Sequence, residues 1–165
     1  MTTIELIPHL DAGDRHAWPG DQDERPLSEL GWEQARAIAQ ALAAEPIAAL
    51  FASPALRARQ TLEPLAALLG LPIETLPALA ERGEYETERR LGDRGEAALQ
   101  ELARRHPGGR VAAASHRDII PIVIQRLAFE HGLRVEQFVG RGQWYSIDLG
   151  KDVRLALRGS PLHAG

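Results

Sequence analysis

Apolar residues recur at positions i, i+3, i+4 and i+7 in three parts of the chain, a spacing that places them on one face of an α-helix. We expect three amphipathic helices, each packing its apolar face on a core. A weaker pattern predicts a fourth helix from about Arg94 to Arg105. The three strong sets are Ala35, Ile38, Ala39 and Leu42; Leu62, Leu65, Ala66 and Leu69; and Ile120, Val123, Ile124 and Leu127.

Residues at the ends of these segments are typical of helix boundaries. Ser53 and Pro54 predict an N-cap followed by proline at the first helical position. Gly70 is a typical helix stop, and Gly132 predicts the end of the last helix in the same way. The helical pattern and these boundary signals therefore predict the same segments.

Short strand-like runs lie between the predicted helices, at 3–7, 48–52, 111–115, 144–149 and 153–157. Strands that alternate with helices predict an α/β fold, here a three-layer sandwich in which helices flank a largely parallel sheet. The last two strands are separated by a short polar turn, so we expect a hairpin and hence a mixed sheet. Two long segments without a pattern, 11–26 and 77–92, are expected to be functional loops.

Composition limits the possible functions. With 165 residues, 44% of them hydrophobic, the chain can form a single domain covering 1–165. Its formal net charge of −4 gives no global basic field, so we expect no nucleic-acid partner. The absence of cysteine excludes disulfides, thiolate catalysis and iron–sulfur ligation.

Hydropathy gives no sign of targeting or membrane insertion. The first eleven residues lack a cationic region and a long apolar region, so we expect no signal peptide. The longest apolar run, 119–129, is interrupted by Gln125 and Arg126 and is too short to span a bilayer. We therefore expect a cytoplasmic protein without a membrane partner.

Polar residues with catalytic potential follow three of the predicted strands. In open α/β sheets, ligands bind beyond the carboxyl ends of the strands. His9 follows the first strand, Ser53-Pro54 with Arg57 the second, and Ser115-His116 the strand at 111–115. We expect these residues to form one site.

The chemistry of this set favours a phosphate group. A helix that begins near Ser53 offers unpaired backbone N–H groups, and Arg57 could add a bidentate guanidinium. Two histidines beside a bound phosphate suggest phosphoryl transfer, with one imidazole attacking phosphorus and the other stabilising charge. No metal is required, and the sequence has no histidine or carboxylate cluster at metal-ligand spacing. The structural alternative is that His9 and His116 are core histidines and that Arg57 is solvated.

Several motifs resemble those of the histidine phosphatase superfamily, which has the phosphoglycerate-mutase-like fold. "LFASPALRARQTLEPLAALLGLPI" resembles the "SSP..RA.QT" segment of this family, and "AAASHRDIIP" is similar to its second-histidine motif. "AGDRHAWPGDQDERPLSELGWEQARAIAQAL" and "GRGQWYSIDL" resemble the first loop and helix and the segment before the last strand. The resemblance is greatest to the small bacterial phosphohistidine-phosphatase branch and to the phosphatase domains attached to some Nudix hydrolases, and it runs almost end to end.

The resemblance implies a role for individual residues. His9 matches the phosphorylated nucleophile, His116 the second pocket histidine, and Arg57 the phosphate-binding arginine. We count Ser115 and Arg15 with Arg57 as candidate phosphate-binding residues.

Glu81, in "PALAERGEYE", best matches the acid that protonates the leaving group. Glu84, Glu86 and Asp11 remain alternatives for this proton donor. Arg25 could serve the pocket rim.

Three residues depart from the family motifs. The first motif of the family is Arg-His-Gly or Arg-His-Ala, whereas here it is Pro8-His9-Leu10. Proline has neither a guanidinium nor a backbone N–H, and losing one such donor typically costs on the order of 10²–10³-fold in rate. Leu10 could crowd the phosphate or redirect the loop. Arg117 replaces the usual glycine and could supply a compensating cation.

Two functions follow from these expectations. The first is a cofactor-independent phosphatase that is weakened by Pro8 and acts through a phosphohistidine intermediate. Its substrate would be a phosphorylated small molecule or a phosphohistidine protein. The second is an inactive pseudophosphatase that binds a phosphorylated ligand or partner. The predicted hairpin could also leave an edge strand for a second chain, so both a monomer and a homodimer are possible.

Overall fold

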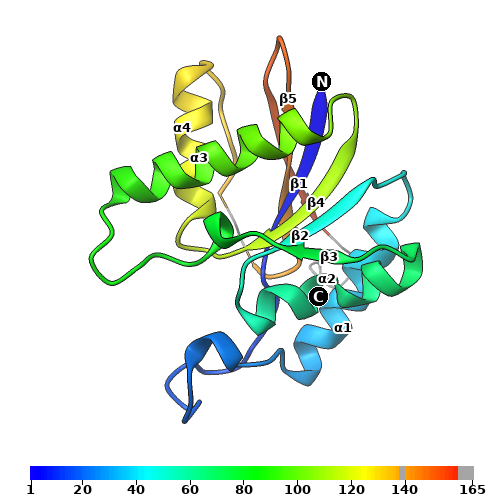
Figure 1. The fold of residues 1–165 in the computed structure, drawn as a ribbon, viewed down its shortest axis with the longest axis vertical. Helices are drawn as coiled ribbons and strands as arrows, with labels where there is room; N and C mark the ends of the chain where they lie inside the picture. Colours follow the sequence, from blue (N-terminus) through cyan, green and yellow to red (C-terminus); the bar gives the residue numbers. More distant parts are fainter. Residues whose placement is uncertain (138–139, 160–165) are drawn as a thin grey trace.

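The computed structural model describes residues 1–137 and 140–159, which form one sheet with helices on both faces (Figure 1). The elements in chain order are β1 (Thr2–Pro8), η1 (Gln22–Glu24), α1 (Glu29–Leu42), β2 (Ala49–Ala52), α2 (Leu56–Leu69), β3 (Ile73–Thr75), η2 (Pro77–Leu79), α3 (Glu88–Arg105), β4 (Arg110–Ser115), α4 (Ile120–Glu130), β5 (Gln143–Leu149) and β6 (Arg154–Gly159). Within the described residues, no helix has the length and apolar character needed to cross a membrane.

The six strands are ordered β3-β2-β4-β1-β5-β6. The first four in this order are parallel, whereas β5 is antiparallel to β1 and β6 is antiparallel to β5. This arrangement confirms the predicted mixed, largely parallel sheet and the C-terminal hairpin. β3 was not predicted, because its three side chains at the sheet edge are partly or fully exposed and show no apolar pattern.

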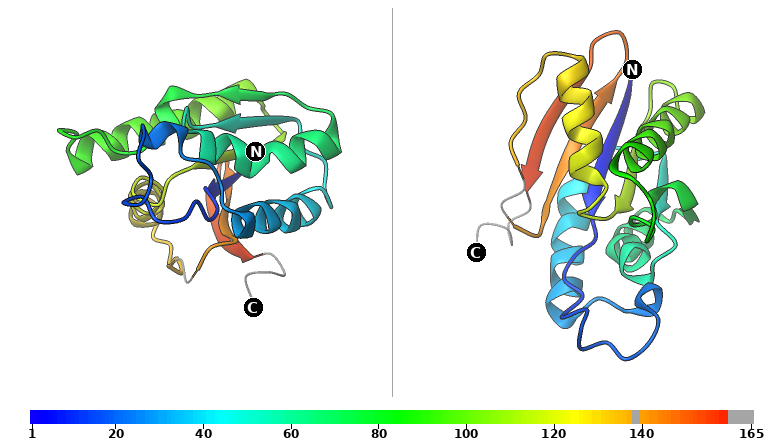
Figure 2. Two further views of the ribbon diagram at one scale, coloured as in Figure 1. Left: turned by 90° about the horizontal axis from the view of Figure 1, so that it is seen from below. Right: turned by 90° about the vertical axis from the view of Figure 1, so that its left-hand side faces the viewer.

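The helices form two layers. One apolar cluster packs α1 and α2 on one face of the sheet, and a second packs α3 and α4 on the other. Figure 2 shows the two helix layers with the sheet between them. The predicted three-layer sandwich is therefore confirmed, and residues that alternate along β2, such as Leu50 and Phe51, belong to opposite clusters.

Two helix boundaries differ from the predictions. α3 begins at Glu88 rather than near Arg94, because Thr87 caps it and its first turn is polar. α2 begins at Leu56, so the prediction that Ser53 is its N-cap and Pro54 its first residue was wrong. The hydroxyl of Ser53 accepts a hydrogen bond from the backbone N–H of Ala55, two residues before the helix proper.

The register of the parallel strands sets the position of the site. Pro8 lies opposite Ser115, and Ala52 lies opposite Ala114, so β1, β2 and β4 end at the same edge. The backbone N–H of His9 donates to the Ser115 carbonyl at 2.9 Å, which extends the ladder by one residue. His9 and His116 therefore directly follow the ends of the adjacent strands β1 and β4, at the same level of the sheet.

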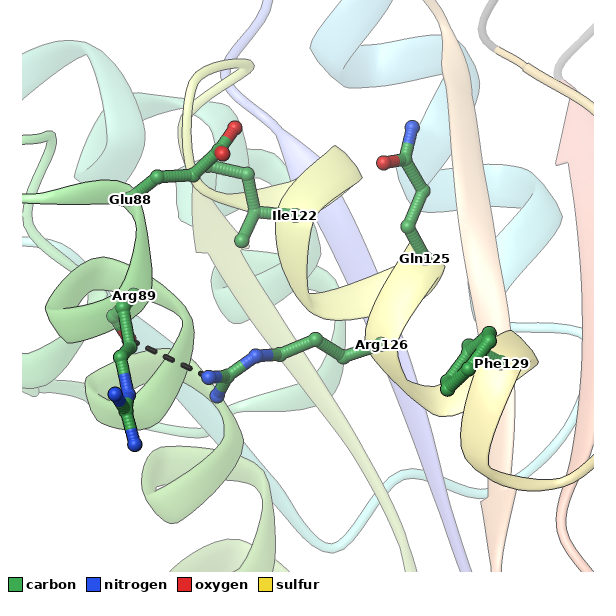
Figure 3. Close-up of a pocket in the computed structure, with 6 residues that line it drawn as sticks. All are labelled: Glu88, Arg89, Ile122, Gln125, Arg126 and Phe129. Carbon is green, nitrogen blue, oxygen red and sulfur yellow. Dashed lines mark hydrogen bonds between the residues drawn. The ribbon is translucent and has the colours of Figure 1, made fainter.

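α3 and α4 approach closely because α3 carries two glycines on the contact side. A Cβ atom at Gly95 would lie 2.3 Å from Cγ2 of Val123, so only glycine fits there without a shift. At Gly92 a Cβ would meet only the guanidinium end of Arg126, which crosses the surface pocket between the two helices to the Arg89 carbonyl (Figure 3).

This difference predicts opposite effects of alanine at the two glycines. We expect Gly95→Ala to lower the free energy of unfolding by about 1–3 kcal/mol, because the new methyl group overpacks the α3–α4 contact. Gly92→Ala is the matched control, because the flexible Arg126 side chain can move and alanine favours the helix by up to about 1 kcal/mol. Urea denaturation of the three proteins measures both effects. Equal stability of the two variants would contradict the described helix contact.

Candidate active site

His9 is buried and has one ring nitrogen fixed by the backbone. Its Nδ1 lies 2.8 Å from the Leu10 carbonyl oxygen, which can only accept a hydrogen bond, so Nδ1 carries a proton. In the neutral ring the lone pair is then on Nε2. Burial, and then the charges of Arg57, Arg141 and Arg25, lower the pKa of His9 to about 3, although the Leu10 bond opposes this shift. His9 is therefore a neutral imidazole at neutral pH, with its lone pair on Nε2.

His116 lies beside His9, with ring centroids 5.3 Å apart. Its Nε2 is 2.7 Å from the hydroxyl of Ser53, while its buried Nδ1 has no hydrogen-bond partner within the described residues. Burial, followed by the charges of His9 and Arg57, lowers the pKa of His116 to about 2. The 3.7 Å approach to Glu81 is thus a contact of a neutral ring and not a salt bridge.

Ser53 can set the tautomer of His116. Its hydroxyl oxygen already accepts from the Ala55 N–H, so its own hydrogen is available for Nε2 of His116. Nδ1 of His116 then carries the ring proton and is a donor that lacks a partner. Such a buried donor costs free energy unless an acceptor binds there.

Arg57 is almost completely buried, with 1% of its side chain exposed, near the N-terminus of α2. Its guanidinium donates to the carbonyl of Gln22 and, at 3.0 Å, to Glu81, while its Nε has no partner within the described residues. A guanidinium with an unpaired donor beside two neutral histidines has the chemistry suited to an oxyanion. The predicted convergence of His9, Arg57 and His116 is thus observed.

Among the four candidate proton donors, the structure brings Glu81 to this group. Its carboxylate contacts Arg57 and lies near His116, and Arg15 approaches it at 3.8 Å from the exposed rim. Glu86 instead forms a bidentate pair with Arg94, which lowers the pKa of Glu86 to about 2.

The other two candidate proton donors have different surroundings. Glu84 is exposed. Asp11 accepts from the Ser28 hydroxyl at 2.5 Å and approaches Nε of Arg141 at 3.7 Å.

Two arginines near the histidines were not assigned a central role from the sequence. Arg25 was predicted at the rim, yet it is buried and donates to the Ala12 carbonyl at 2.7 Å. Arg141 donates to the carbonyl of His9 at 3.0 Å. The only signal for Arg141 was its place between two glycines just before a strand that pairs with β1.

The remaining predicted residues differ in their surroundings. The Ser115 hydroxyl donates to the Leu79 carbonyl at 2.6 Å and so holds η2 against β4; its assignment to phosphate stays a prediction. The side chain of Arg117 is exposed.

Leu10 is fully buried in the apolar cluster under α1 and α2, so its side chain is part of the core. The expectation that Pro8 removes a charge from the pocket stays a prediction, and the charge of Arg117 acts on Arg141.

Pro8 occupies a position that tolerates proline. The N–H groups of Thr3 and His9 point toward β4, so alternation directs the N–H position of Pro8 toward β5. The pairing of β1 with β5 ends at Leu6 and Tyr145, so proline removes no described ladder bond.

No cluster of three or more metal-ligating side chains occurs in the part of the chain that is described.

The sheet, which carries two buried histidines and a buried arginine at its strand ends, has the histidine phosphatase fold. The family model of the histidine phosphatase superfamily (branch 1) matches residues 13–89. The solved structure of the protein histidine phosphatase SixA, complexed with tungstate, is 27% identical, with 99% of each chain covered and a TM-score of 0.72. The chain is thus similar in sequence to the histidine phosphatase superfamily over residues 13–89, and similar in fold to SixA along its whole length.

Two further comparisons are informative. The chain is 33% identical over 123 residues to the 8-oxo-(d)GTP phosphatase of Mycolicibacterium smegmatis, covering 74% of this chain and 36% of that protein. It spans about a third or less of the curated relatives that it matches. Phosphoserine phosphatase from Entamoeba histolytica shares the fold, with a TM-score of 0.77 at 15% identity and 98% of each chain covered.

The two buried histidines predict a loss of stability in mild acid. Unfolded histidine takes up a proton below about pH 6.5, whereas folded His9 and His116 remain neutral until about pH 3 and about pH 2. The unfolded state therefore binds more protons, and the free energy of unfolding falls as pH decreases. For the pair we expect a loss of roughly 2 kcal/mol between pH 6 and pH 5.

Urea denaturation at fixed ionic strength, without phosphate, measures this slope. The double variant His9→Gln/His116→Gln should lose most of the slope, whereas the exposed-residue control His131→Gln should retain it. An unchanged slope in the double variant would show that the two rings are not buried in the neutral form.

Proposed function

We propose that this chain is a cofactor-independent phosphatase that acts through a phosphohistidine at His9. The observation that carries the proposal is the neutral His9 ring, whose Nδ1 is bound to the Leu10 carbonyl so that Nε2 holds the lone pair. Three buried residues that can donate to an oxyanion lie beside it. Arg57 and His116 each have a donor without a partner among the described residues, and Arg25 is a charged donor. A nucleophile and an anion site in contact are what phosphoryl transfer requires.

In the first step, Nε2 of His9 attacks phosphorus while the bond from phosphorus to the ester oxygen breaks. Glu81 in its protonated form donates a proton to the leaving oxygen, because it is the carboxyl group that lies next to His116 and Arg57. Phosphate oxygens on Arg57 would compete with Glu81 for the guanidinium and so release the carboxyl group to act. The equatorial oxygens accept hydrogen bonds from Arg57 and from Nδ1 of His116.

In the second step, water attacks the phosphorus of phosphohistidine and the N–P bond breaks. The Glu81 carboxylate takes the proton from this water, which restores the acid for the next cycle. Inorganic phosphate leaves, and His9 returns to its neutral form. The cycle needs no electron carrier and no metal-bound nucleophile.

The substrate is proposed to be a small phosphate ester or a phosphohistidine protein. SixA, a protein histidine phosphatase, and the mycobacterial 8-oxo-(d)GTP phosphatase are relatives that support these two classes. Arg15, a candidate phosphate-binding residue that is exposed and approaches Glu81 at 3.8 Å, would contact either substrate from the rim.

A second candidate function is phosphate recognition without turnover. The observation that favours it is Pro8, which offers no donor to a transition state. The buried donors of Arg57 and His116 do not depend on Pro8 and would still bind a phosphorylated ligand.

Variants at positions 8 and 9 separate these two functions. We expect the parent to hydrolyse 4-nitrophenyl phosphate or a phosphohistidine protein, and His9→Ala to abolish this activity. Pro8→Arg should raise kcat/KM by at least about tenfold, equivalent to roughly 1.4 kcal/mol of transition-state stabilisation. Activity only in Pro8→Arg would support the recognition function. Undiminished activity in His9→Ala would rule out the proposed mechanism.

The role of Glu81 predicts a dependence on the leaving group. With Glu81→Gln we expect kcat to fall on the order of 10²-fold or more for an alkyl phosphate, whose leaving oxygen needs a proton. The loss should be much smaller for 4-nitrophenyl phosphate, whose phenolate leaves without one. Steady-state kinetics of both substrates give this comparison, with Glu84→Gln as the matched control. Equal losses for the two substrates would remove Glu81 from the role of proton donor.

A further inference from the structure

The pocket lacks a cation at position 8, but a different arginine reaches the nucleophile from the neighbouring strand. β5 runs antiparallel to β1 with Tyr145 opposite Leu6. Continuing this register by four residues places Arg141 opposite Leu10 and next to His9. Arg141 is thus brought to the carboxyl end of β1, where the first motif lies.

Contacts hold the Arg141 guanidinium at this place. Nη1 donates to the carbonyl of His9 at 3.0 Å, and Nε lies 3.7 Å from the Asp11 carboxylate. Asp11 is itself fixed, because its other oxygen accepts from Ser28 and its backbone N–H donates to Gln34. The guanidinium is therefore oriented by two groups that flank Leu10 in the chain.

The backbone around Arg141 is suited to presenting one long side chain. Gly142 has a φ of 86°, a conformation that side chains other than glycine rarely adopt. The N–H of Gly140 donates to the side chain of the buried Gln143 at 3.0 Å, which closes the turn before β5. Arg141 is thus carried by an ordered turn, with 32% of its side chain exposed.

The electrostatic environment also favours an added anion. The charge of Arg141 helps to lower the pKa of His9. Burial, and then the charge of Arg117, lower the pKa of Arg141, while Asp11 opposes this shift. A guanidinium among other cations is stabilised when an anion binds between them.

We propose that Arg141 is a phosphate-binding residue that replaces, from β5, the guanidinium that the first motif lacks at Pro8. This inference rests on the proposed phosphatase function and adds a residue to its site. One N–H of Arg141 holds the His9 carbonyl. In this proposal, a remaining N–H of the same guanidinium donates to the phosphate on His9. The same side chain thereby links the position of the nucleophile to the charge of the transferring group.

The test is a double-mutant cycle with Arg141→Gln and Pro8→Arg, read out by kcat/KM for 4-nitrophenyl phosphate and by the inhibition constant of orthovanadate. In the parent background we expect Arg141→Gln to lower kcat/KM on the order of 10²-fold and to raise the inhibition constant of vanadate at least about tenfold. In the Pro8→Arg background the effect should shrink to under about threefold, because the guanidinium added at position 8 then supplies most of the phosphate contact that Arg141 supplies in the parent. Arg141→Lys should restore vanadate binding in part.

Arg154→Gln is the matched control, because Arg154 is an exposed arginine opposite Asp148, at the other end of the sheet from His9. Equal losses of kcat/KM with Arg141→Gln in both backgrounds would overturn the inference. A lower kcat with an unchanged inhibition constant of vanadate would overturn it too, because Arg141 would then only position His9. Calorimetric titration of vanadate separates this inference from the proposed function. If the parent protein binds vanadate but shows no turnover, Arg141→Gln must still lower the affinity for vanadate about tenfold. Otherwise the inference fails. A parent that neither turns over nor binds vanadate contradicts both.

Discussion

Parallel pairing of β4 with β1 and β2 is the constraint on which the site depends. It brings three strand ends to one edge, so that His9, Ser53 and His116 meet although they are far apart in the chain. The bonds from the His9 and Ser53 N–H groups to the carbonyls of Ser115 and Ala114 set their relative level. Thr61 adds a link from α2, since its hydroxyl accepts from the Leu10 N–H and donates to the Arg57 carbonyl.

Burial at this edge determines the chemical state of the two histidines. A neutral ring with Nδ1 bound to a carbonyl is a ready nucleophile, and the same burial lowers the stability of the protein in acid. The nearby charges are mostly arginines, and Glu81 is the carboxylate that approaches them most directly. Arg57 and His116 each have a buried donor without a partner among the described residues, and in the proposed function an oxyanion satisfies both.

The fold was predictable from the sequence because its helices show clear apolar spacing and its strands are short apolar runs between them. The start of α3 was missed because Thr87 caps a polar first turn, and β3 because it is a three-residue edge strand. Ser53 was assigned to a helix cap, since a hydroxyl before proline has that pattern whether or not a histidine lies beside it. In the site, His9, Arg57, His116 and Glu81 could be chosen by motif. Arg25 was expected only at the pocket rim and Arg141 was not singled out, because the burial of Arg25 and the contact of Arg141 with His9 arise from tertiary packing.

The central claim is that His9 is phosphorylated during turnover, and its most direct test is to trap that intermediate. The parent protein is mixed with ³²P-labelled substrate, quenched in alkali within milliseconds to seconds and digested for peptide mapping. The account predicts label that is stable in alkali, labile in acid and confined to the peptide containing His9. A substrate that is hydrolysed without any such label, or label that persists in His9→Ala, would contradict it.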